Sequence, residues 1–494
     1  MSDRQFLNYI NGEWVAGSGS APIADVNPAD TREIIGYATD STEADVNDAV
    51  AAALAAYESW RRTPAPVRGR VVAKAAMLFE ERAAEIGEVL CREEGKILAE
   101  ASGEVRKGAN IVEFIAGEAR RLNGQTIPSE LSDNFAYTVR VPHGVVGLIT
   151  PWNFPMAIPA WKIAPALVTG NTIVLKGAEQ TPWVTEMVVQ AFIDAGVPKG
   201  VLNMVQGRGV PAGSALVEHK DVAAISFTGS TEIGHAIYAR GALQGKPVQC
   251  ELGGKNPIIV LDDADLNMAV AATAKGAFGS TGQRCTATSR AIVQRGVHDQ
   301  FVEALLKQAA QVVPGNGLQP SSTMGPSVDK DQFDKVHEYL AIGKEEGAQI
   351  RCGGGRASDG DLGHGLFTQP TVWTGVTEDM RVAREEIFGP VLSVIAVDDF
   401  EQALSVANNV EFGLTSSLYT QDITKVFRYI EDIETGMLHV NSPTIGGEAQ
   451  LPFGGMKKTG IGPREQGPTA IEFFSEWKTV YIDYTGGFRG GNLY

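Results

Sequence analysis

The side chains best suited to covalent chemistry are a cysteine and a glutamate in two glycine-rich segments. Cys285 lies among small residues in the stretch FGSTGQRCTATSR, and Glu251 begins the stretch ELGGKNP. A cysteine becomes a nucleophile when it is accessible and its pKa is lowered, which small neighbours and a nearby cation or helix start can provide. A glutamate becomes a general base when modest burial raises its pKa. We therefore take Cys285 as candidate nucleophile and Glu251 as candidate base, with a buried structural thiol as the alternative for Cys285.

The other cysteines show no pattern for covalent or metal chemistry. Cys91, Cys250 and Cys352 form no CxxC pair, and no cysteine has ligand-like spacing with the seven histidines. The sequence therefore predicts neither a disulfide framework nor a metal site. We interpret these three cysteines as structural, although Cys250 adjoins Glu251 and could lie beside the reacting groups.

Two segments could bind a nucleotide. The stretch FTGSTEIG, residues 227–234, joins an apolar run to a helical segment, and free N–H groups at a helix start can bind phosphate. Its GxxxxG spacing is less specific than GxGxxG, so an ordinary strand-to-helix turn is an equal alternative. Lys176 and Glu179 end the β-like run NTIVLKGAE and could reach a ribose. By themselves they are better explained as exposed surface charges.

The periodicity predicts the elements that must position these residues. Residues 42–121 have the apolar spacing of long helices. From Tyr137 onward, short β-branched runs alternate with helical stretches, which is typical of a doubly wound parallel sheet. A second α/β series begins after about Lys255. The extended segments 125–141 and 476–484 have no sheet of their own, so we expect them to pair with each other or with a partner chain.

Composition limits the classes of function. The 494 residues are 44% hydrophobic and 20% charged, which predicts a globular protein of two or three compact units. The net charge of −17 and pI near 5.0 argue against general binding of nucleic acid or anionic membranes. Neither a signal peptide nor an apolar run of membrane-spanning length is evident. We predict a cytoplasmic protein that acts on small molecules.

Taken together, the motifs resemble those of the aldehyde dehydrogenase superfamily, from about Tyr9 to Tyr484. The most specific matches are ELGGKNP and GQRC, which end at Pro257 and Cys285. Supporting matches are PWNFP at 151–155, AWKIAPAL around Lys162, EIFGP at 386–390 and LPFGG at 451–455. The ordered occurrence of all these motifs makes a chance resemblance negligible.

The resemblance implies a reaction. Cys285 would add to the aldehyde carbonyl, and the Asn153 side-chain amide and the Cys285 backbone N–H would hold the resulting oxyanion. After hydride transfer to the nicotinamide, Glu251 would activate the water that hydrolyses the thioester. Lys162 and Glu465 match inner positions of the family that would relay the proton outward.

The resemblance also implies NAD as the cofactor, with NADP possible. The residues it assigns to cofactor binding are Pro151, Trp152, Lys176, Glu179, Gly209, Gly229, Ser230, Leu252, Glu386 and Phe388. Glu179 would accept hydrogen bonds from the ribose and repel a 2′-phosphate, which favours NAD. NADP stays open because some relatives with this glutamate use both cofactors, and because Gly177 replaces the usual proline.

The implied fold is α/β, with two doubly wound Rossmann-like domains and a small β oligomerisation flap. Residues 1–121 and 144–253 would form the cofactor domain and residues 254–460 the catalytic domain. Residues 122–143 and 461–494 would form the flap. We expect a homo-oligomer, either a tetramer or a dimer.

The substrate is predicted from finer similarities. GQRCTATSR, EARRLNGQTIPS and the loop at 442–444 look closest to semialdehyde dehydrogenases acting on 2-oxoglutarate semialdehyde or succinate semialdehyde. A carboxylated substrate needs a cation, which Arg284 or Arg121 could supply. Arg284 could equally point away and hold its loop. The candidate substrate residues are Phe154, Trp161, Arg284, Ser442 and Phe453.

Three other functions are alternatives. A broad-specificity aldehyde dehydrogenase is the main alternative. A CoA-acylating relative would not need Glu251, and a retired structural or binding protein would be expected to have lost Cys285, Glu251 or Asn153, whereas all three are present.

The glycine-rich tail 485–494 leaves two interpretations. Chain ends are commonly free, and four glycines make ordering this one costly. The alternative is that Phe488, Arg489, Leu493 and Tyr494 dock on a neighbouring subunit near the substrate entrance.

Overall fold

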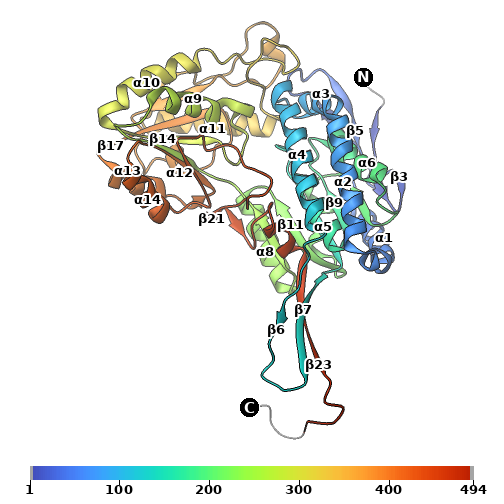
Figure 1. Ribbon diagram of the computed structural model, residues 1–494. Coiled ribbons are helices and arrows are strands. Elements are labelled where there is room, and N and C mark those ends of the chain that lie inside the picture. The colour runs from blue at the N-terminus through green and yellow to red at the C-terminus, as the bar shows by residue number, and fades with distance from the viewer. Residues whose placement is uncertain (1–3, 490–494) are drawn as a thin grey trace.

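The computed structural model describes residues 4–489, which form two α/β lobes and a long β flap (Figure 1). The sheet of the first lobe has eight strands. In order across the sheet they are β22 (Gly460–Ile461), β12 (Val248–Glu251), β11 (Val222–Thr228), β8 (Val145–Ile149), β9 (Thr172–Lys176), β10 (Leu202–Val205), β2 (Asn8–Ile10) and β3 (Glu13–Val15). The five central strands are parallel, and β22, β2 and β3 add antiparallel edges.

The second lobe is built on a seven-stranded sheet. Its order is β15 (Gln349–Cys352), β16 (Thr371–Thr374), β17 (Val391–Val397), β14 (Thr288–Gln294), β13 (Asn256–Val260), β19 (Thr415–Tyr419) and β20 (Met437–Val440). All neighbours are parallel except β15 and β16. Five further strands are β1 (Gln5–Phe6), β4 (Ile23–Val26), β5 (Ile34–Ala38) and the pair β18 (Phe412–Gly413) with β21 (Met456–Lys457).

Helices connect the parallel strands. In the first lobe they are α1 (Glu43–Arg62), α2 (Ala65–Glu81), α3 (Ala83–Glu93), α4 (Leu98–Glu118), α5 (Ala157–Thr169), α6 (Pro182–Ala195), α7 (Ser214–Glu218) and α8 (Thr231–Leu243). Next come α9 (Leu266–Phe278), α10 (Arg295–Ala309), α11 (Lys330–Glu345), α12 (Arg381–Arg384), α13 (Phe400–Asn408), α14 (Ile423–Asp432) and α15 (Thr469–Phe473). Single turns occur at Gly209–Gly213, Gly279–Gly282 and Gly360–His364.

Both large sheets are covered on both faces. Along β13, Ile258 and Val260 pack into one hydrophobic cluster, and Ile259 packs into another on the opposite face. Successive side chains of a strand point to opposite faces, so a strand buried on both sides is apolar at every position. The continuous run NPIIV has this pattern, and the predicted α/β fold class is confirmed.

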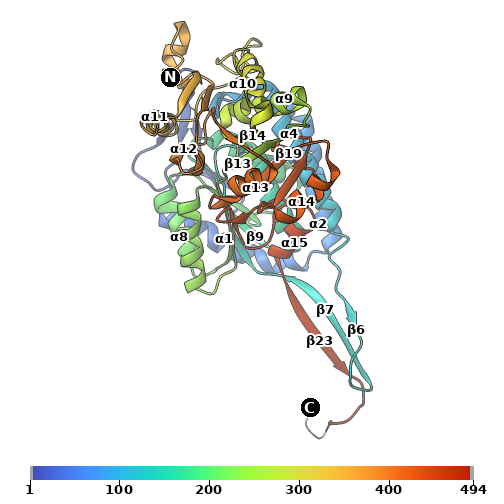
Figure 2. The same ribbon diagram turned by 90° about the vertical axis from the view of Figure 1, so that its left-hand side faces the viewer.

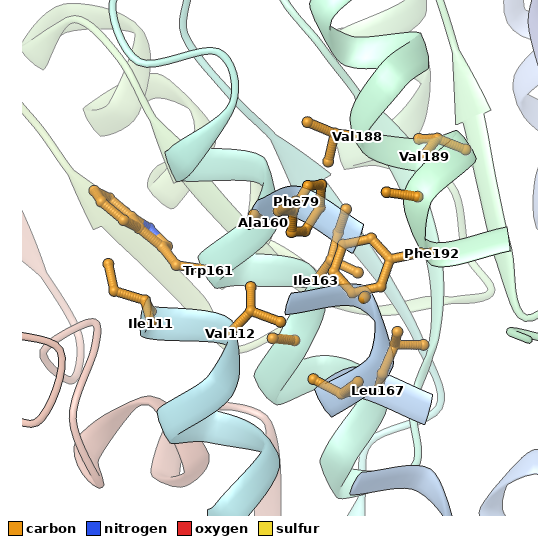
Figure 3. Close-up of a cluster of buried hydrophobic side chains, with 14 of the residues drawn as sticks. Phe79, Ile111, Val112, Ala160, Trp161, Ile163, Leu167, Val188, Val189 and Phe192 are labelled. Atoms are coloured by element: carbon orange, nitrogen blue, oxygen red, sulfur yellow. The ribbon is translucent and has the colours of Figure 1, made fainter. Parts of the chain in front are cut away.

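The largest core lies where α2, α4, α5 and α6 pack together (Figure 3). Phe79 and Phe192 meet edge to face with ring centroids 5.6 Å apart. Every residue of α5 is buried, which explains why this helix is apolar on all sides. It ends at Gly170, whose φ of 101° suits a residue without a side chain. This packing fixes α4 and α5, the two helices that border the candidate site.

The flap is an antiparallel sheet that projects from the body of the molecule (Figure 2). It contains β6 (Thr126–Ile127), β7 (Asn134–Pro142) and β23 (Ser475–Asp483), with Ser475 opposite Pro142 at one end and Asp483 opposite Asn134 at the other. The two extended segments thus pair with each other, one of the two arrangements expected. Beyond the flap, Arg489 forms an ion pair with Asp483. The remaining tail residues, 490–494, lie outside the described part of the chain.

The predicted domain boundaries stay a prediction. The first sheet takes strands from residues 8–15, 145–251 and 460–461, and the second takes strands from residues 256–440.

None of the described helices combines the length and the apolarity that a membrane span requires.

Candidate active site

Cys285 lies in a tightly held loop between α9 and β14. Just before it, Ser280 and Thr281 have positive φ values of 47° and 59°. This left-handed backbone is costly, above all for the β-branched Thr281. The loop is held by the Thr281 hydroxyl, which donates to the Gly325 carbonyl at 3.0 Å, and by the Asn256 amide, which donates to the Cys285 carbonyl at 2.7 Å. The surrounding structure therefore maintains a strained backbone immediately before the candidate nucleophile.

A cavity of about 250 Å³ reaches the Cys285 side chain from one side. One wall is a single face of α4, because Glu100, Gly103, Glu104 and Lys107 are spaced by three and four residues. The other lining residues are Phe154, Ile158, Trp161, Thr228, Glu251, Leu252, Arg284, Cys285, Thr286, Gly446, Gly447 and Phe453. Four of the five predicted substrate residues line this first cavity, and Ser442 does not.

A second cavity of about 170 Å³ also reaches Cys285. It is lined by Pro151, Trp152, Asn153, Ile158, Thr228, Gly229, Ser230, Leu252, Gly253, Cys285, Gln332, Lys335, Glu386 and Phe388. Cys285, Thr228, Ile158 and Leu252 border both cavities. The thiol is therefore accessible from two compartments, one bordered by α4 and one by the start of α8.

The structure brings Asn153 to the Cys285 loop. Its side-chain amide donates to the carbonyl of Gln283 at 3.1 Å. Its own carbonyl accepts a hydrogen bond from the buried Lys96 ammonium at 2.8 Å. Both ends of Asn153 are thus held, and its side-chain amide lies against the loop that carries Cys285.

Glu251 ends β12 and lines the first cavity together with Cys285. It is buried, and its Oε2 has no hydrogen-bond partner within residues 4–489. Burial, followed by the Glu465 carboxylate, raises the pKa of Glu251 well above its usual value. A Cβ on Gly454 would lie 2.5 Å from Glu251 Oε1, so this glycine makes room for the carboxylate. The raised pKa and the free oxygen suit a general base.

Behind Glu251 lies a buried ion pair between Lys162 and Glu465. The Lys162 ammonium also donates to the Ser226 hydroxyl at 2.7 Å. The Trp161 indole N–H donates to the second oxygen of Glu465 at 2.8 Å. These contacts hold the charges that act on Glu251, since Glu465 raises and Lys162 lowers its pKa.

The Cys285 thiol does not have the lowered pKa that its sequence context suggested. Burial, followed by the Glu251 carboxylate, raises the pKa of Cys285 to about 12, and the charge of Lys107 and a hydrogen bond from the Thr286 backbone N–H oppose this rise. The pKa is raised rather than lowered because burial and the negative charge of Glu251 outweigh the positive charge of Lys107. A thiol with a raised pKa needs a base to accept its proton before it attacks.

The second cavity has features that fit a dinucleotide. The hydroxyls of Thr228 and Thr231 are buried without hydrogen-bond partners in the described chain. α8 starts at Thr231, and the Ser230 side chain does not cap it, which leaves N–H groups for an anion. Gly254 N–H donates to the Glu386 carboxylate at 2.9 Å, and a Cβ on Gly253 would collide with that carboxylate.

Aromatic rings close one side of this cavity. Trp152 and Phe388 meet nearly at right angles with ring centroids 5.5 Å apart. Phe388 has a φ of 59°, an unusual backbone conformation for such a large residue. The rings and the Glu386 carboxylate together provide both a flat apolar surface and acceptors for hydroxyl groups.

Several predicted residues do not border the two cavities. Lys176 and Glu179 form an ion pair at 3.0 Å near the end of β9, and Gly209 follows β10. Ser442 accepts a hydrogen bond from the Ser417 hydroxyl through its carbonyl. Arg121 is exposed and pairs with the neighbouring Glu118, so it is not the cation of the first cavity.

Sequence reasoning missed Lys107, although it lines the first cavity. The signal was available, because Lys107 follows Glu100 by seven residues in a segment predicted to be helical. A charged helical residue usually faces solvent, so this spacing alone does not place Lys107 in a site. Within residues 4–489, no group of three or more His, Cys, Asp or Glu side chains is placed to hold a metal ion.

Comparison with known proteins gives consistent results. The model of the family described as the aldehyde dehydrogenase family matches residues 14–480. The chain is 45% identical over 477 residues to an alpha-ketoglutaric semialdehyde dehydrogenase of Bacillus subtilis, covering 97% of this chain and 98% of that protein. It is 43% identical over 478 residues to an alpha-ketoglutarate semialdehyde dehydrogenase of Haloferax volcanii, covering 97% and 99% of the two chains. A crystal structure of Staphylococcus aureus betaine aldehyde dehydrogenase in complex with NAD⁺ matches with a TM-score of 0.95, at 35% identity over 98% of this chain and 95% of that chain.

Proposed function

Since the chain belongs to the aldehyde dehydrogenase family, we propose that it oxidises a short carboxylated semialdehyde, such as 2-oxoglutarate semialdehyde, to the corresponding acid with NAD. The observation that carries this proposal is the position of Cys285 at the junction of two cavities. The aldehyde would occupy the first cavity and the cofactor the second. Succinate semialdehyde is the second substrate of this class that we propose.

In this proposal Cys285 is the nucleophile. After losing its proton, its sulfur adds to the aldehyde carbon and gives a thiohemiacetal oxyanion. The Asn153 side-chain amide and the Cys285 backbone N–H donate hydrogen bonds to that oxygen, and they act on charge that exists only after attack. Asn153 would exchange its present bond to the Gln283 carbonyl for a bond to the oxyanion.

Glu251 is the base of the second half-reaction. When bound, the nicotinamide ring accepts the hydride that leaves the substrate carbon, and a thioester remains on Cys285. Glu251 then takes a proton from the water that attacks this thioester, releasing the acid and the thiol. Its partner-free Oε2 favours this role, and the ion pair of Lys162 and Glu465 lies behind it for passing the proton outward.

The residues proposed to hold the cofactor fall into two groups. Pro151, Trp152, Gly229, Ser230, Leu252, Glu386 and Phe388 line the second cavity, as does Thr228, whose hydroxyl has no hydrogen-bond partner within residues 4–489. Lys176, Glu179 and Gly209 lie farther along the same edge of the sheet, at the carboxyl ends of β9 and β10, where we propose that the adenosine binds.

We further propose that the chain forms a homo-oligomer, dimer or tetramer, through the flap. Trp477, Tyr481 and Tyr484 are 49%, 72% and 63% exposed on or just beyond β23, and such apolar surface favours burial against another subunit. The domain division at residues 121, 143, 253 and 460 and the cytoplasmic location remain predictions.

Formation of NADH with a panel of aldehydes, with and without CoA, tests the proposed function. We expect turnover without CoA, with kcat/KM about tenfold or more higher for 2-oxoglutarate or succinate semialdehyde than for neutral aldehydes of equal length. A strict requirement for CoA, or a preference for neutral aldehydes, would contradict it.

A further inference from the structure

Lys107 is a cation of the first cavity to which the sequence analysis assigned no role. It lies on the face of α4 that also carries Glu100, Gly103 and Glu104, and it is half-buried. Its charge acts on Cys285, because it opposes the rise in the pKa of that thiol. Lys107 is therefore in the same compartment as the reacting sulfur, at a distance over which charges interact.

The acidic side chains of the cavity are already engaged by other groups. Glu104 accepts hydrogen bonds from the backbone N–H groups of Met156 and Ala157 at 2.9 and 3.1 Å through one oxygen. Its other oxygen pairs with the buried Lys96 ammonium at 2.6 Å. Glu100 pairs with Arg284 at 2.9 Å and also accepts from the Ser280 N–H. Each carboxylate is thus already paired with another cation, and Glu104 acts on Lys107 only through its charge, without a hydrogen bond or ion pair.

Arg284 makes its polar contacts with its own loop and with α4. One end of its guanidinium pairs with Glu100, and its Nε donates to the Ser280 hydroxyl at 3.0 Å. These bonds tie the strained turn before Cys285 to α4. Of the two interpretations of Arg284 left open by the sequence, its contacts favour the one in which it holds the loop.

Lys107 is different, because it has neither a hydrogen bond nor an ion pair within residues 4–489. Burial is the main cause that lowers the pKa of its ammonium, which shows that the protein alone solvates this charge poorly. A poorly solvated charge without a partner is costly unless a ligand compensates it. The cavity therefore favours an anionic group beside Lys107.

The space beside Lys107 is kept open by glycines. A Cβ on Gly447 would lie 3.7 Å from the Lys107 ammonium nitrogen, and Cβ atoms on Gly103 and Gly446 would meet nothing within 4 Å. Gly446 and Gly447 have φ values of 121° and 156°. Their missing side chains leave room for a polar group to reach the ammonium.

We propose that Lys107 binds the distal carboxylate of the substrate while the aldehyde carbon rests on Cys285, and that Arg284 is a positioning residue for the Cys285 loop. This inference rests on the proposed function and assigns its specificity to one side chain. The ammonium would select for aldehydes with a terminal anion, and the glycines beside it would admit their carboxylates.

The test compares succinate semialdehyde with butanal, which has the same number of carbon atoms and no charge. For Lys107→Met we expect the ratio of kcat/KM for succinate semialdehyde to kcat/KM for butanal to fall by about ten- to a hundredfold, because the loss of the charge that acts on Cys285 affects both substrates alike. Lys107→Arg keeps the charge and should retain most of the preference. For Arg284→Met we expect both substrates to lose activity alike, together with a lower Tm, because the loop is loosened.

A second measurement does not depend on turnover. Succinate, the product dicarboxylate, is titrated calorimetrically into the wild type and into Lys107→Met, and we expect its Kd to rise by about tenfold or more in the variant. Unchanged succinate binding, an equal loss on both aldehydes, or a selective loss in Arg284→Met rather than Lys107→Met would overturn the role of Lys107. A wild type that prefers butanal would instead contradict the proposed function itself.

Discussion

Protonation of two residues controls the chemistry at Cys285. The Glu251 carboxyl is buried and Cys285 is half-buried, and the pKa of each is raised. Burial opposes the charged form of each group, so the ionised fraction of Glu251 limits how readily it accepts a proton from the thiol or from water. The proposed roles can be separated by removing one group at a time.

Replacing Cys285 with alanine should remove the covalent step while leaving the fold intact. We expect Cys285→Ala to lower kcat by at least about a thousandfold, because the nucleophile is absent. Tm and NAD affinity, measured by thermal unfolding and fluorescence titration, should remain near wild-type values. Retained turnover in this variant would contradict the thioester mechanism.

Glu251→Gln should separate the two half-reactions. The amide cannot take a proton from water, so the thioester should accumulate after a burst of about one NADH per site. Rapid-mixing absorbance measures the burst, and intact-protein mass spectrometry detects the acyl-enzyme. If the burst itself disappears, Glu251 acts mainly on the thiol.

The raised pKa of Glu251 also predicts a pH dependence. The carboxyl is a base only when ionised, so hydrolysis should be slow below its pKa and rise by about tenfold per pH unit toward it. Because burial and Glu465 raise this pKa, the acid limb should lie at higher pH than for an ordinary glutamate. Single-turnover deacylation measured across pH tests this, with Glu251→Gln as the control that should lack the limb.

Cofactor preference depends on Glu179. It pairs with Lys176 at 3.0 Å, so Glu179→Ser removes a carboxylate and releases a cation at the same point. We expect the ratio of kcat/KM for NADP to that for NAD to rise by about tenfold. A wild type that already favours NADP would show that Glu179 does not face the ribose.

At the scale of elements, α4 connects the first cavity to α5. Glu104 of α4 binds the N–H groups at the start of α5 and pairs with the buried Lys96. We expect Glu104→Gln to destabilise the protein by about 3 kcal/mol, because it removes the closer of the two carboxylates that pair with the buried Lys96 and leaves only Glu94 at 3.9 Å. Urea unfolding measures the change. The matched control is Glu113→Gln on the exposed face of the same helix, which should change stability by about 0.5 kcal/mol or less.

Elements with strong periodicity could be predicted from the sequence, and those defined by distant pairing could not. The helical spacing of residues 42–121 corresponds to α1 through α4, and the run NPIIV is β13. In contrast, β22 has two residues and joins the first sheet only because Cys250 and Glu251 lie opposite it. No local pattern in Gly460–Ile461 encodes that partner.

The candidate site, like the fold, could be predicted only in part from the sequence. Cys285, Glu251 and Asn153 were identified through motifs, and the structure brings them to the same two cavities. The position of Lys107 in the first cavity and the ion pair between Arg284 and Glu100 both depend on how α4 packs against the Cys285 loop. Such packing follows from tertiary structure, so residue types and spacing alone left the role of Arg284 open.

At the scale of the whole molecule, the flap presents a candidate interface. Substituting Trp477 and Tyr481 together with lysine should weaken assembly, because both side chains are exposed and apolar. Sedimentation velocity should show the main species shift toward the protomer. The matched control replaces the exposed Phe427 of α14 with lysine, which should leave the sedimentation coefficient unchanged.

The tail gives a separate test at this scale. Phe488 is 98% exposed, and Arg489 contacts Asp483 of the flap. If the tail docks on a neighbouring subunit, deletion of residues 485–494 should weaken the oligomer or raise activity on bulky aldehydes. An unchanged sedimentation coefficient and substrate profile would instead indicate a free end.

The meeting of two cavities at one sulfur has a consequence for inhibition. Because aldehyde and nucleotide would approach Cys285 through separate compartments, neither needs to block the entrance of the other. A compound confined to the α4 side would therefore compete with the aldehyde alone. A longer compound that passes the thiol and fills both compartments would compete with both substrates at once. A compound that links two weakly binding fragments across Cys285 would then combine their binding free energies. It would lose translational and rotational freedom once, whereas two separate fragments would each lose it.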